Sequence, residues 1–438
     1  MKINMNSKLK TDTIAICLIV AMMVMQLSLT KIFARIIPVF NYPYNPPVLC
    51  VVYVLIMLCV YALVFVPRVT DVTSESGSNR IGKKIVSIVT DYKELAIILG
   101  VLLVSIALTD VITIVRGQLR ITNILTHNLD YLYAFLALPI SVLLTDGKWK
   151  WTQLADTMLA LSALSAALRT FVSVYYTLTG IEITIISKES AGPYWFRNNR
   201  LRVTAPCFIC LCIALAVYMF MYSKSVIKKI IYVVEVAIIL GYGYFIWQAR
   251  AGLVTIVAGA AIVVLFGTMT KKQFYIRWGC VGLAAIVFIA CGGIQKLVKA
   301  FSMAEDAQYV MENRGHYYAY ELFFGVFKDN ILGNGLTEDL AIWFPNGRAM
   351  WMCDAGFMYS LVPMGITILI FYILMFARGL QVYLKYRKKT VLAVLALAFT
   401  ATICVGELSM DCFFTPLAFE VPFYLGIVEY IAHKKEEI

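Results

Sequence analysis

Residues 47–66 read PVLCVVYVLIMLCVYALVFV, an uncharged stretch of membrane-spanning length. A transmembrane helix needs about 20 consecutive apolar residues. The whole chain shares this character, because 61% of its 438 residues are hydrophobic, only 15% are charged, and the mean hydropathy is +0.80. A soluble protein of this size needs more polar surface to face water. The stretch therefore predicts a membrane helix, and the composition predicts a membrane protein.

Similar stretches recur along the chain, and we identify twelve of them. They cover residues 13–34, 47–66, 95–115, 129–145, 154–178, 203–221, 229–247, 251–268, 278–294, 354–377, 390–407 and 414–432. A transmembrane β-barrel would show short alternating segments in place of these unbroken runs. We therefore expect an all-α, polytopic integral membrane protein with about 12 transmembrane helices, forming a single membrane domain over residues 1–438.

Basic residues set the expected orientation. Lys2, Lys8 and Lys10 precede the first apolar run, which lacks a small-residue cleavage site and therefore predicts a retained helix. Threading twelve spans from a cytoplasmic N-terminus places most basic residues, largely lysines, in the inner segments. This distribution follows the positive-inside rule. It predicts a multi-pass plasma-membrane protein with both termini in the cytoplasm.

The outer segments carry mainly arginine, which orientation does not explain. The planar guanidinium fork suits bidentate binding of phosphate or carboxylate. We therefore expect an anion-binding site on the extracytoplasmic face. The outer arginines are Arg35, Arg116, Arg120, Arg197, Arg200, Arg202, Arg250, Arg314 and Arg348.

One outer loop, 295–353, is far longer than the others. Within it, residues 312–328 predict an amphipathic helix that begins near Asn313 and carries Arg314 and Glu321 on one face and His316 on another. The free N–H groups of a helix N-terminus bind phosphate oxygens well. The alternative is an interfacial helix whose charges are only solvated.

Two further outer positions combine arginine with aromatic residues or a tight turn. Arg250 lies in Trp247-Gln-Ala-Arg-Ala-Gly252, between two apolar runs, and either binds an anion or extends to the lipid headgroups. Arg197 and Arg200 follow Tyr194-Trp195-Phe196. Flat aromatic surfaces pack on sugar rings. The alternative is an interfacial aromatic belt with basic neighbours.

Charged residues inside the spans are costly and often functional. We expect Asp110 and Arg169 to form a structural ion pair, since both lie in the outer halves of their helices. Glu235, Glu407, Asp411 and Glu420 are further candidates for a base, and spacing singles out none of them.

Several soluble-enzyme signatures are missing from the sequence. It contains no GxxxxGK[ST], no GxGxxG after a strand, no HExxH and no Asp-x-Asp. Nucleotide hydrolysis, dinucleotide redox chemistry and zinc proteolysis therefore lack support. We expect no metal, no cofactor and no nucleic-acid partner.

Taken together, these features resemble the O-antigen polymerase and O-antigen ligase superfamily of bacterial cell-surface polysaccharide assembly. The similarity lies in Arg250 after a tight outer turn and in Arg314 at the start of a helix in a long late loop. It also lies in two short motifs, Phe327-Lys-Asp-Asn-Ile-Leu-Gly-Asn-Gly335 and Asp354-Ala-Gly-Phe-Met-Tyr-Ser-Leu-Val-Pro-Met-Gly-Ile366. The first is similar to the family's glycine turn and the second to its segment ending in Gly-Ile. The resemblance covers about residues 195–370.

The resemblance implies a membrane glycosyltransferase acting on the outer face. Its donor would be an undecaprenyl-diphosphate-linked oligosaccharide in the lipid bilayer, and a chain-length regulator and a flippase would be its protein partners. Arg250 and Arg314, with Arg197 or Arg200, would bind the diphosphate.

The base that accepts the proton of the attacking hydroxyl would be His316, Asp354 or Glu321. Ligases of this superfamily carry a histidine where the tenth span begins, and this chain has Met352-Cys353-Asp354 there. We therefore expect a polymerase of capsule, O-antigen or exopolysaccharide repeat units, with a ligase as the alternative.

A lipid-linked oligosaccharide flippase or another secondary transporter is a rival reading, since twelve spans with both termini inside are typical of carriers. Transporters show repeats and polar groups at mid-membrane. This chain has no visible repeat, and its polar residues gather outside the spans. We therefore favour the enzyme.

Overall fold

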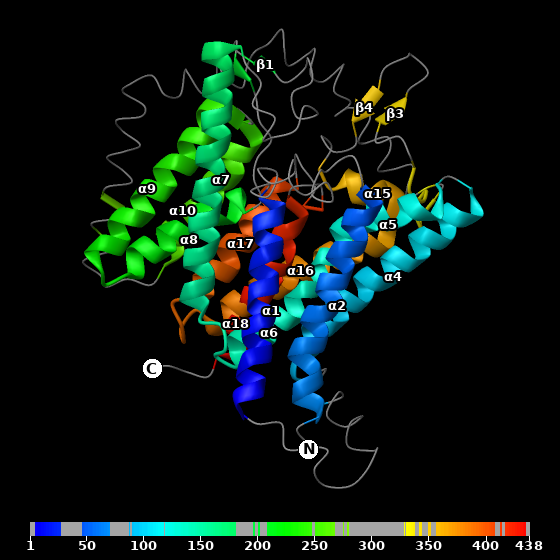
Figure 1. Ribbon diagram of the computed structural model, residues 1–438, viewed down its shortest axis with the longest axis horizontal. Coiled ribbons are helices and arrows are strands. Elements are labelled where there is room, and N and C mark those ends of the chain that lie inside the picture. The colour runs from blue at the N-terminus through cyan, green and yellow to red at the C-terminus, as the bar shows by residue number, and fades with distance from the viewer. Residues whose placement is uncertain are drawn as a thin grey trace.

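The structure, a computed structural model, describes residues 5–27, 46–70, 87, 90–117, 119–180, 196–197, 200–201, 208–247, 250–267, 275, 278–279, 328, 330–337, 341–343, 349–351, 356–407, 412–413 and 417–434. These residues are almost entirely helical (Figure 1). The helices are α1 (Met5–Gln26), α2 (Pro46–Thr70), α4 (Lys93–Val115), α5 (Ile121–Leu132), η3 (Tyr133–Leu136), α6 (Ala137–Thr145), α7 (Trp151–Thr179), α8 (Ile209–Tyr222), α9 (Val226–Tyr242), the π-helical turn η6 (Gly243–Trp247), α10 (Arg250–Phe266), α15 (Met358–Met364), α16 (Ile366–Tyr386), α17 (Ala393–Gly406), η8 (Leu417–Glu420) and α18 (Val421–His433).

Two antiparallel hairpins accompany the helices. Strand β1 (Phe196–Arg197) pairs with β2 (Arg200–Leu201), and β3 (Ala341–Trp343) pairs with β4 (Ala349–Trp351). Neither hairpin was predicted from the sequence. The helical class is confirmed for the rest of the described chain.

Six described helices are long and apolar enough to cross a membrane, which is the architecture of a multi-pass membrane protein. They are Cys50–Val69, Lys93–Val115, Asn123–Thr145, Trp151–Thr179, Val226–Trp247 and Ile366–Tyr386. Large apolar side chains point outward along them, as a lipid-facing surface requires; Leu58, Val111 and Ile373 are each about 60% exposed.

Each predicted span except the ninth overlaps at least one described helix, although the bounds differ. The ninth, 278–294, lies outside the described residues apart from 278 and 279. The count of twelve crossings stays a prediction.

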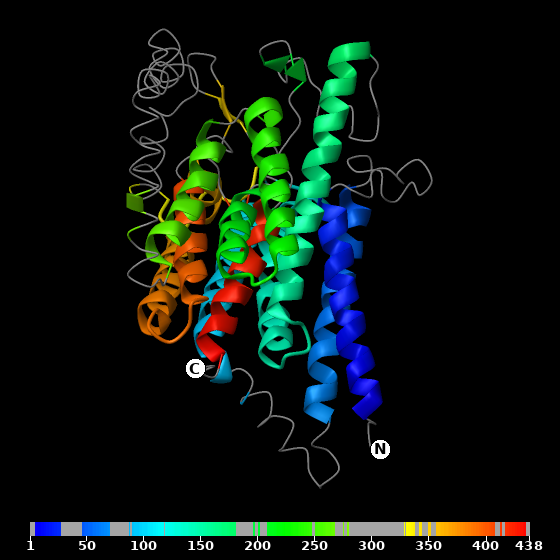
Figure 2. The same cartoon turned by 90° about the vertical axis from the view of Figure 1, so that its left-hand side faces the viewer.

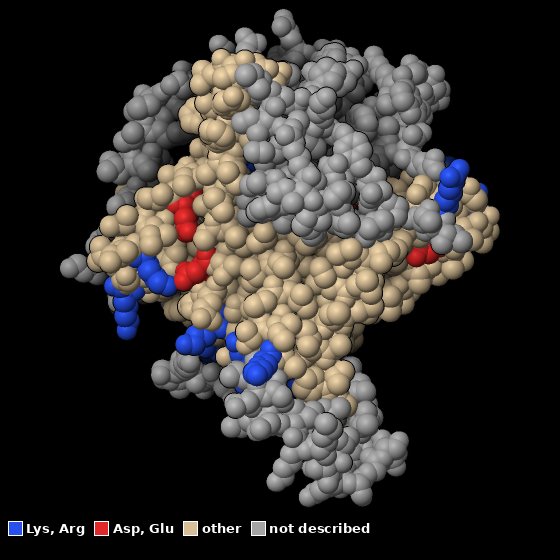
Figure 3. All heavy atoms as spheres, in the orientation of Figure 1, with Lys and Arg blue, Asp and Glu red and all other residues tan. Residues whose placement is uncertain are grey.

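The two ends of the helical body carry different groups. We call the end where α1 begins and α18 finishes the tail end, and the opposite end, where β1–β4 lie, the hairpin end (Figures 1 and 2). Figure 3 shows a broad, mostly uncharged band that contains a few acidic side chains; most of the basic side chains on this face lie at its lower edge, toward the tail end, and one basic group lies at the upper right.

Ion pairs tie helix ends together at the tail end. Arg68 of α2 binds Asp12 of α1 and Asp146 after α6, each at 2.8 Å. Arg378 of α16 binds Glu429 of α18 at 2.6 Å; the Glu429 side chain is buried and that of Arg378 is 10% exposed. The start of α1, the end of α2, the residue after α6 and the C-terminal part of α18 are therefore at one end, as the threading predicts.

The predicted ion pair between Asp110 and Arg169 is wrong. Asp110 accepts hydrogen bonds from Asn128 Nδ2 at 2.8 and 2.9 Å. Arg169 donates to the carbonyl of Leu27 at 3.0 Å and to the hydroxyl of Ser165. A carbonyl at the C-terminus of α1 is a good partner for a buried cation, because the helix dipole is negative there.

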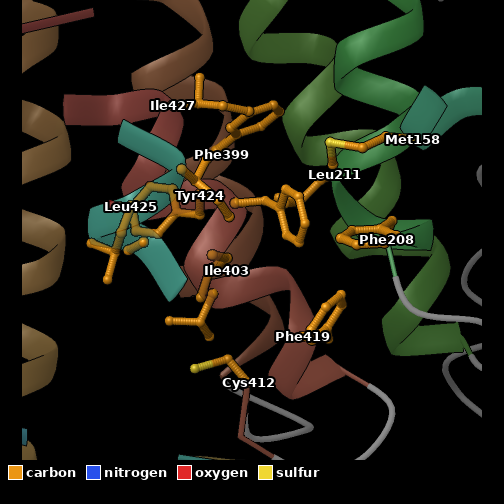
Figure 4. Packing of buried hydrophobic residues seen from close by; sticks show 14 of the residues in the cluster. Met158, Phe208, Leu211, Phe399, Ile403, Cys412, Phe419, Tyr424, Leu425 and Ile427 are labelled. Carbon is orange, nitrogen blue, oxygen red and sulfur yellow. The ribbon is translucent and has the colours of Figure 1, made fainter. Parts of the chain in front are cut away.

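The core lies where α8, α10, α16, α17 and α18 pack together. Phe208, Leu211, Phe399 and Tyr424 meet there from three of these helices (Figure 4). Without a strong hydrophobic drive inside lipid, close contact through small residues holds such helices together. Gly259 of α10 is one example, since an added Cβ would lie 2.1 Å from Thr402 Oγ1 and 3.1 Å from Ala214 Cβ.

Candidate functional site

The glycine turn of residues 330–336 lies at the hairpin end. Gly333 and Gly335 have φ of 91° and 79°, a backbone conformation that glycine adopts without steric cost. The N–H of Asn334 donates to the carbonyl of Val362 at 2.9 Å, and that of Gly335 donates to Pro363 at 3.1 Å. Backbone hydrogen bonds therefore attach the turn to α15.

The other side of this contact is the joint between α15 and α16. Gly365 ends α15 with φ 64° and ψ −147°, a region open essentially to glycine alone. A Cβ on Gly365 would lie 2.3 Å from the carbonyl oxygen of Ile331, and a Cβ on Gly333 would lie 2.2 Å from that of Pro363. The two motifs that carry the family resemblance thus touch through two glycines that leave no room for a side chain.

Helix α4 holds the turn from its second side. Thr113 accepts the N–H of Leu336 at 2.8 Å, and Arg116 donates to the carbonyl of Asn334 at 3.0 Å. Arg116 is one of the outer arginines of the sequence, but its hydrogen bond to the glycine turn was not predicted. The spacing of Thr109, Thr113 and Arg116, on one face of an apolar helix, is the signal that could have found it.

Arg197 and Arg200 are brought together by the β1–β2 hairpin. The strand register pairs Arg197 with Arg200, and Phe196 with Leu201. Strand β2 lies beside α7 (Trp151–Thr179). Two positions that the sequence analysis grouped on composition are therefore direct backbone neighbours.

Arg250 is the first residue of α10, at the hairpin end. The π-helical turn η6 precedes it and finishes at Trp247, which is buried. An added Cβ on Gly252 would lie 1.9 to 2.8 Å from three ring atoms of Trp247. The start of α10 at Gly252 therefore packs closely against the Trp247 ring.

The described helices around α10 are short. Helices α8 and α17 have 14 residues each and α18 has 13, so at about 1.5 Å per residue each measures about 20 Å. The hydrocarbon core of a bilayer is about 30 Å thick. Helices α8 and α10 finish side by side at the tail end, since a Cβ added to Gly267 would lie 2.9 Å from the hydroxyl oxygen of Tyr222. Nearer the start of α10, a Cβ added to Gly406 of α17 would lie 3.5 Å from Cγ2 of Thr255. Thr255 is about 7 Å along the helix from Arg250.

Two buried glutamates lie at the ends of these helices. The Oε1 atom of Glu407 accepts the N–H of Cys412 at 2.7 Å, and the Glu407 carbonyl accepts the N–H of Phe357 at 3.0 Å. Glu420 is 3% exposed, and its carboxyl lies beside the backbone of Phe208 and Cys210 at the start of α8. Both carboxyls thus have a structural task, which does not single out either one as a base.

The remaining predicted site residues lie outside the described residues. They are Arg314, His316, Glu321 and Asp354. The described residue nearest to Asp354 on its C-terminal side is Gly356, and the N–H of the following residue, Phe357, donates to the Glu407 carbonyl at the end of α17. Within the described ranges, no three His, Cys, Asp or Glu side chains lie close enough together to hold a metal ion.

The hairpin end thus combines an arginine hairpin, the arginine-led start of α10, and the contact between the two glycine motifs. Guanidinium groups suit a phosphate ligand. Comparison with known proteins gives no further assignment, since no family model matches the chain and no curated protein is significantly similar to it.

Proposed function

We propose that this chain joins undecaprenyl-diphosphate-linked oligosaccharide repeat units on the outer face of the plasma membrane. The product would be a capsule, an O-antigen or another exopolysaccharide. The observation that carries the proposal is the contact of Gly333 with Gly365 at the hairpin end. It joins the two short motifs on which the resemblance to O-antigen polymerases rests, at the end where the chain also places Arg197, Arg200 and Arg250.

The orientation follows from charge. The described basic residues of the tail end are mostly lysine, and Figure 3 places most of the basic side chains on this face at the lower edge of the mostly uncharged band. The positive-inside rule assigns that end to the cytoplasm. The hairpin end would then face outward, with twelve crossings in all.

The arginines would bind the diphosphate. Like charges directly opposite each other in a hairpin repel, so an anion bound beside Arg197 and Arg200 would relieve that repulsion. Arg250 and Arg314 would supply further guanidinium forks, whose planar donors match phosphate oxygens. Partial burial beside hydrocarbon strengthens such contacts relative to water.

The reaction would be a substitution at the anomeric carbon of the donor. The bond from that carbon to the phosphate oxygen breaks, and the lipid diphosphate leaves with the electron pair. A hydroxyl oxygen of the acceptor chain forms the new glycosidic bond, and its proton passes to a base among His316, Asp354 and Glu321. The arginines stabilise the negative charge that develops on the leaving group.

Gel analysis of surface polysaccharide from a deletion strain tests the proposal. Wild-type and variant copies carrying Arg250→Ala, Arg250→Lys or Arg314→Ala are restored separately. We expect single repeat units without the gene, long chains with the wild type, and single units with all three variants, because a lysine point charge does not reproduce the guanidinium fork.

A matched control uses Arg387→Ala at the tail end, where the side chain is exposed. It should restore long chains. Three results would contradict the proposal. Long chains that stay lipid-linked in the deletion strain indicate a ligase, repeat units that never reach the outer leaflet indicate a flippase, and full activity of the arginine variants removes the diphosphate site.

A further inference from the structure

We propose that Trp247 is a positioning residue for Arg250, and that Gly252 is glycine because the Trp247 ring occupies the space of its side chain. This inference rests on the proposed role of Arg250 in binding the lipid diphosphate. It adds a residue pair to that site which the sequence resemblance does not include.

A π-helical turn lies between α9 and α10. The chain leaves α9 through the π-helical turn Gly243–Trp247 and starts α10 at Arg250. π-Helical turns are rare and occur frequently at functional sites. Trp247 is 5% exposed, so its ring is held within the protein and is not an interfacial anchor. The indole is therefore a fixed surface against which the first turn of α10 rests.

The Trp247 ring lies directly against Gly252. A Cβ built on Gly252 would lie 1.9, 2.2 and 2.8 Å from Trp247 Cη2, Cζ3 and Cζ2. Real Cβ atoms do not approach ring atoms this closely, so a methyl group at Gly252 must displace either the ring or the helix. All three atoms belong to the outer edge of the indole, which a phenylalanine at this position would lack.

The rest of α10 is held independently. Gly259 packs against Thr402 and Ala214, and Gly267 packs against Tyr222. These contacts lie about two and a half and almost five turns after Arg250 and fix the body and the end of the helix. A change at Gly252 should therefore move the first turn of α10, with Arg250, while the remainder of the helix stays in place.

A small displacement of Arg250 matters because binding of a diphosphate by a guanidinium depends on alignment. A misplacement of about 1 Å far from the reacting atoms can reduce a rate on the order of 100-fold. Trp247 contributes no charge and needs no contact with the substrate to have this effect. Its effect would be transmitted through the backbone position of Arg250.

The experiment is a double-mutant cycle on the full-length protein in proteoliposomes. The variants are Gly252→Ala, Trp247→Phe and the double variant, and the substrate is the lipid-linked repeat unit extracted from the deletion strain. We expect Gly252→Ala to lower kcat/KM on the order of 100-fold, mainly through a higher KM. The double variant should recover at least tenfold of that loss, since the phenylalanine lacks the clashing edge.

Gly259→Ala is the matched control, because its Cβ would meet Thr402 instead of Trp247. Trp247→Phe should not rescue it. Elution of each variant as a single species in gel filtration separates misfolding from misplacement. Equal activity of Gly252→Ala and wild type would overturn the inference, and so would a double variant no better than Gly252→Ala.

Arg250→Ala separates this inference from the proposed function. If Arg250→Ala is fully active, the diphosphate role fails and the positioning role fails with it. If Arg250→Ala is inactive while the Trp247 and Gly252 variants behave like wild type, the proposed function stands and only the positioning role is lost.

Discussion

Replacing Gly333 by alanine should separate two costs that the structure assigns to the contact between the glycine motifs. The φ of 91° makes the backbone unfavourable for an L-residue, which costs about 1–2 kcal/mol. The added Cβ would also lie 2.2 Å from the Pro363 carbonyl oxygen, a backbone atom that cannot rotate away. Overpacking of this kind costs about 1–3 kcal/mol. The sum is about 2–5 kcal/mol.

Two other glycines isolate the components. Gly180→Ala carries the strain alone, because its φ is 67° and nothing lies within 4 Å of the added Cβ, so we expect a loss of about 1–2 kcal/mol. Gly100→Ala carries neither cost. It lies in the interior of α4 with open space around it, and alanine there should stabilise by about 0.5–1 kcal/mol.

The assay is the apparent melting temperature of the purified protein in detergent, read from the monodisperse gel-filtration peak that survives heating. The expected order is Gly100→Ala above wild type, then Gly180→Ala, then Gly333→Ala. A Gly333→Ala protein that melts with Gly180→Ala would refute the close contact with Pro363. The two glycine motifs would then not be in close contact.

Three further predictions use the same measurement. Arg378→Ala should destabilise the protein by about 3–5 kcal/mol because it leaves the buried carboxylate of Glu429 without its cation. Lys228→Ala breaks an exposed pair and should cost about 0–1 kcal/mol. Equal effects of the two variants would contradict this difference in burial. Arg169→Met should cost about 1.5–3 kcal/mol by removing a charged donor from the carbonyl at the C-terminus of α1, and an unchanged melting temperature would show that this contact adds nothing. Thr113→Val should cost about 1 kcal/mol through the lost hydrogen bond from the Leu336 amide, and it should lower polysaccharide yield only as far as it lowers stability.

The helical membrane body could be predicted from the sequence because its signal is local. Unbroken apolar runs such as 47–66 allow no other spanning structure than a helix. Lysine distribution also placed Arg68, Asp146 and the C-terminal helix at one end, and the ion pairs there agree. These predictions needed no knowledge of which helices pack together.

Partners across the bundle could not be predicted in the same way. Asp110 and Arg169 were paired on depth and opposite charge alone, and the structure gives them Asn128 and the Leu27 carbonyl. A backbone carbonyl at a helix end has no sequence signature. The short length of α8 was equally hidden, since Cys207 and Phe208 continue an apolar run that the structure starts as a helix at Ile209.

The candidate site was predicted in part. Composition singled out Arg197 and Arg200, and the strand register, which was not predicted, places the two positions opposite each other. The glycine motifs were recognised separately, and their contact depends on positive φ at both Gly333 and Gly365. Trp247 was missed because a tryptophan near the end of a predicted span is normally an interfacial anchor. Its burial is visible only in the structure.

The most direct test of the central claim is polymerisation by the purified protein alone. The protein is reconstituted into proteoliposomes with lipid-linked repeat units from the deletion strain, and product length and released lipid diphosphate are measured together. We expect a ladder of lengthening chains, with one lipid diphosphate released for each unit added, and neither product with Arg250→Ala. Folded wild-type protein that yields no longer chains, or that only moves repeat units across the bilayer, would contradict the account.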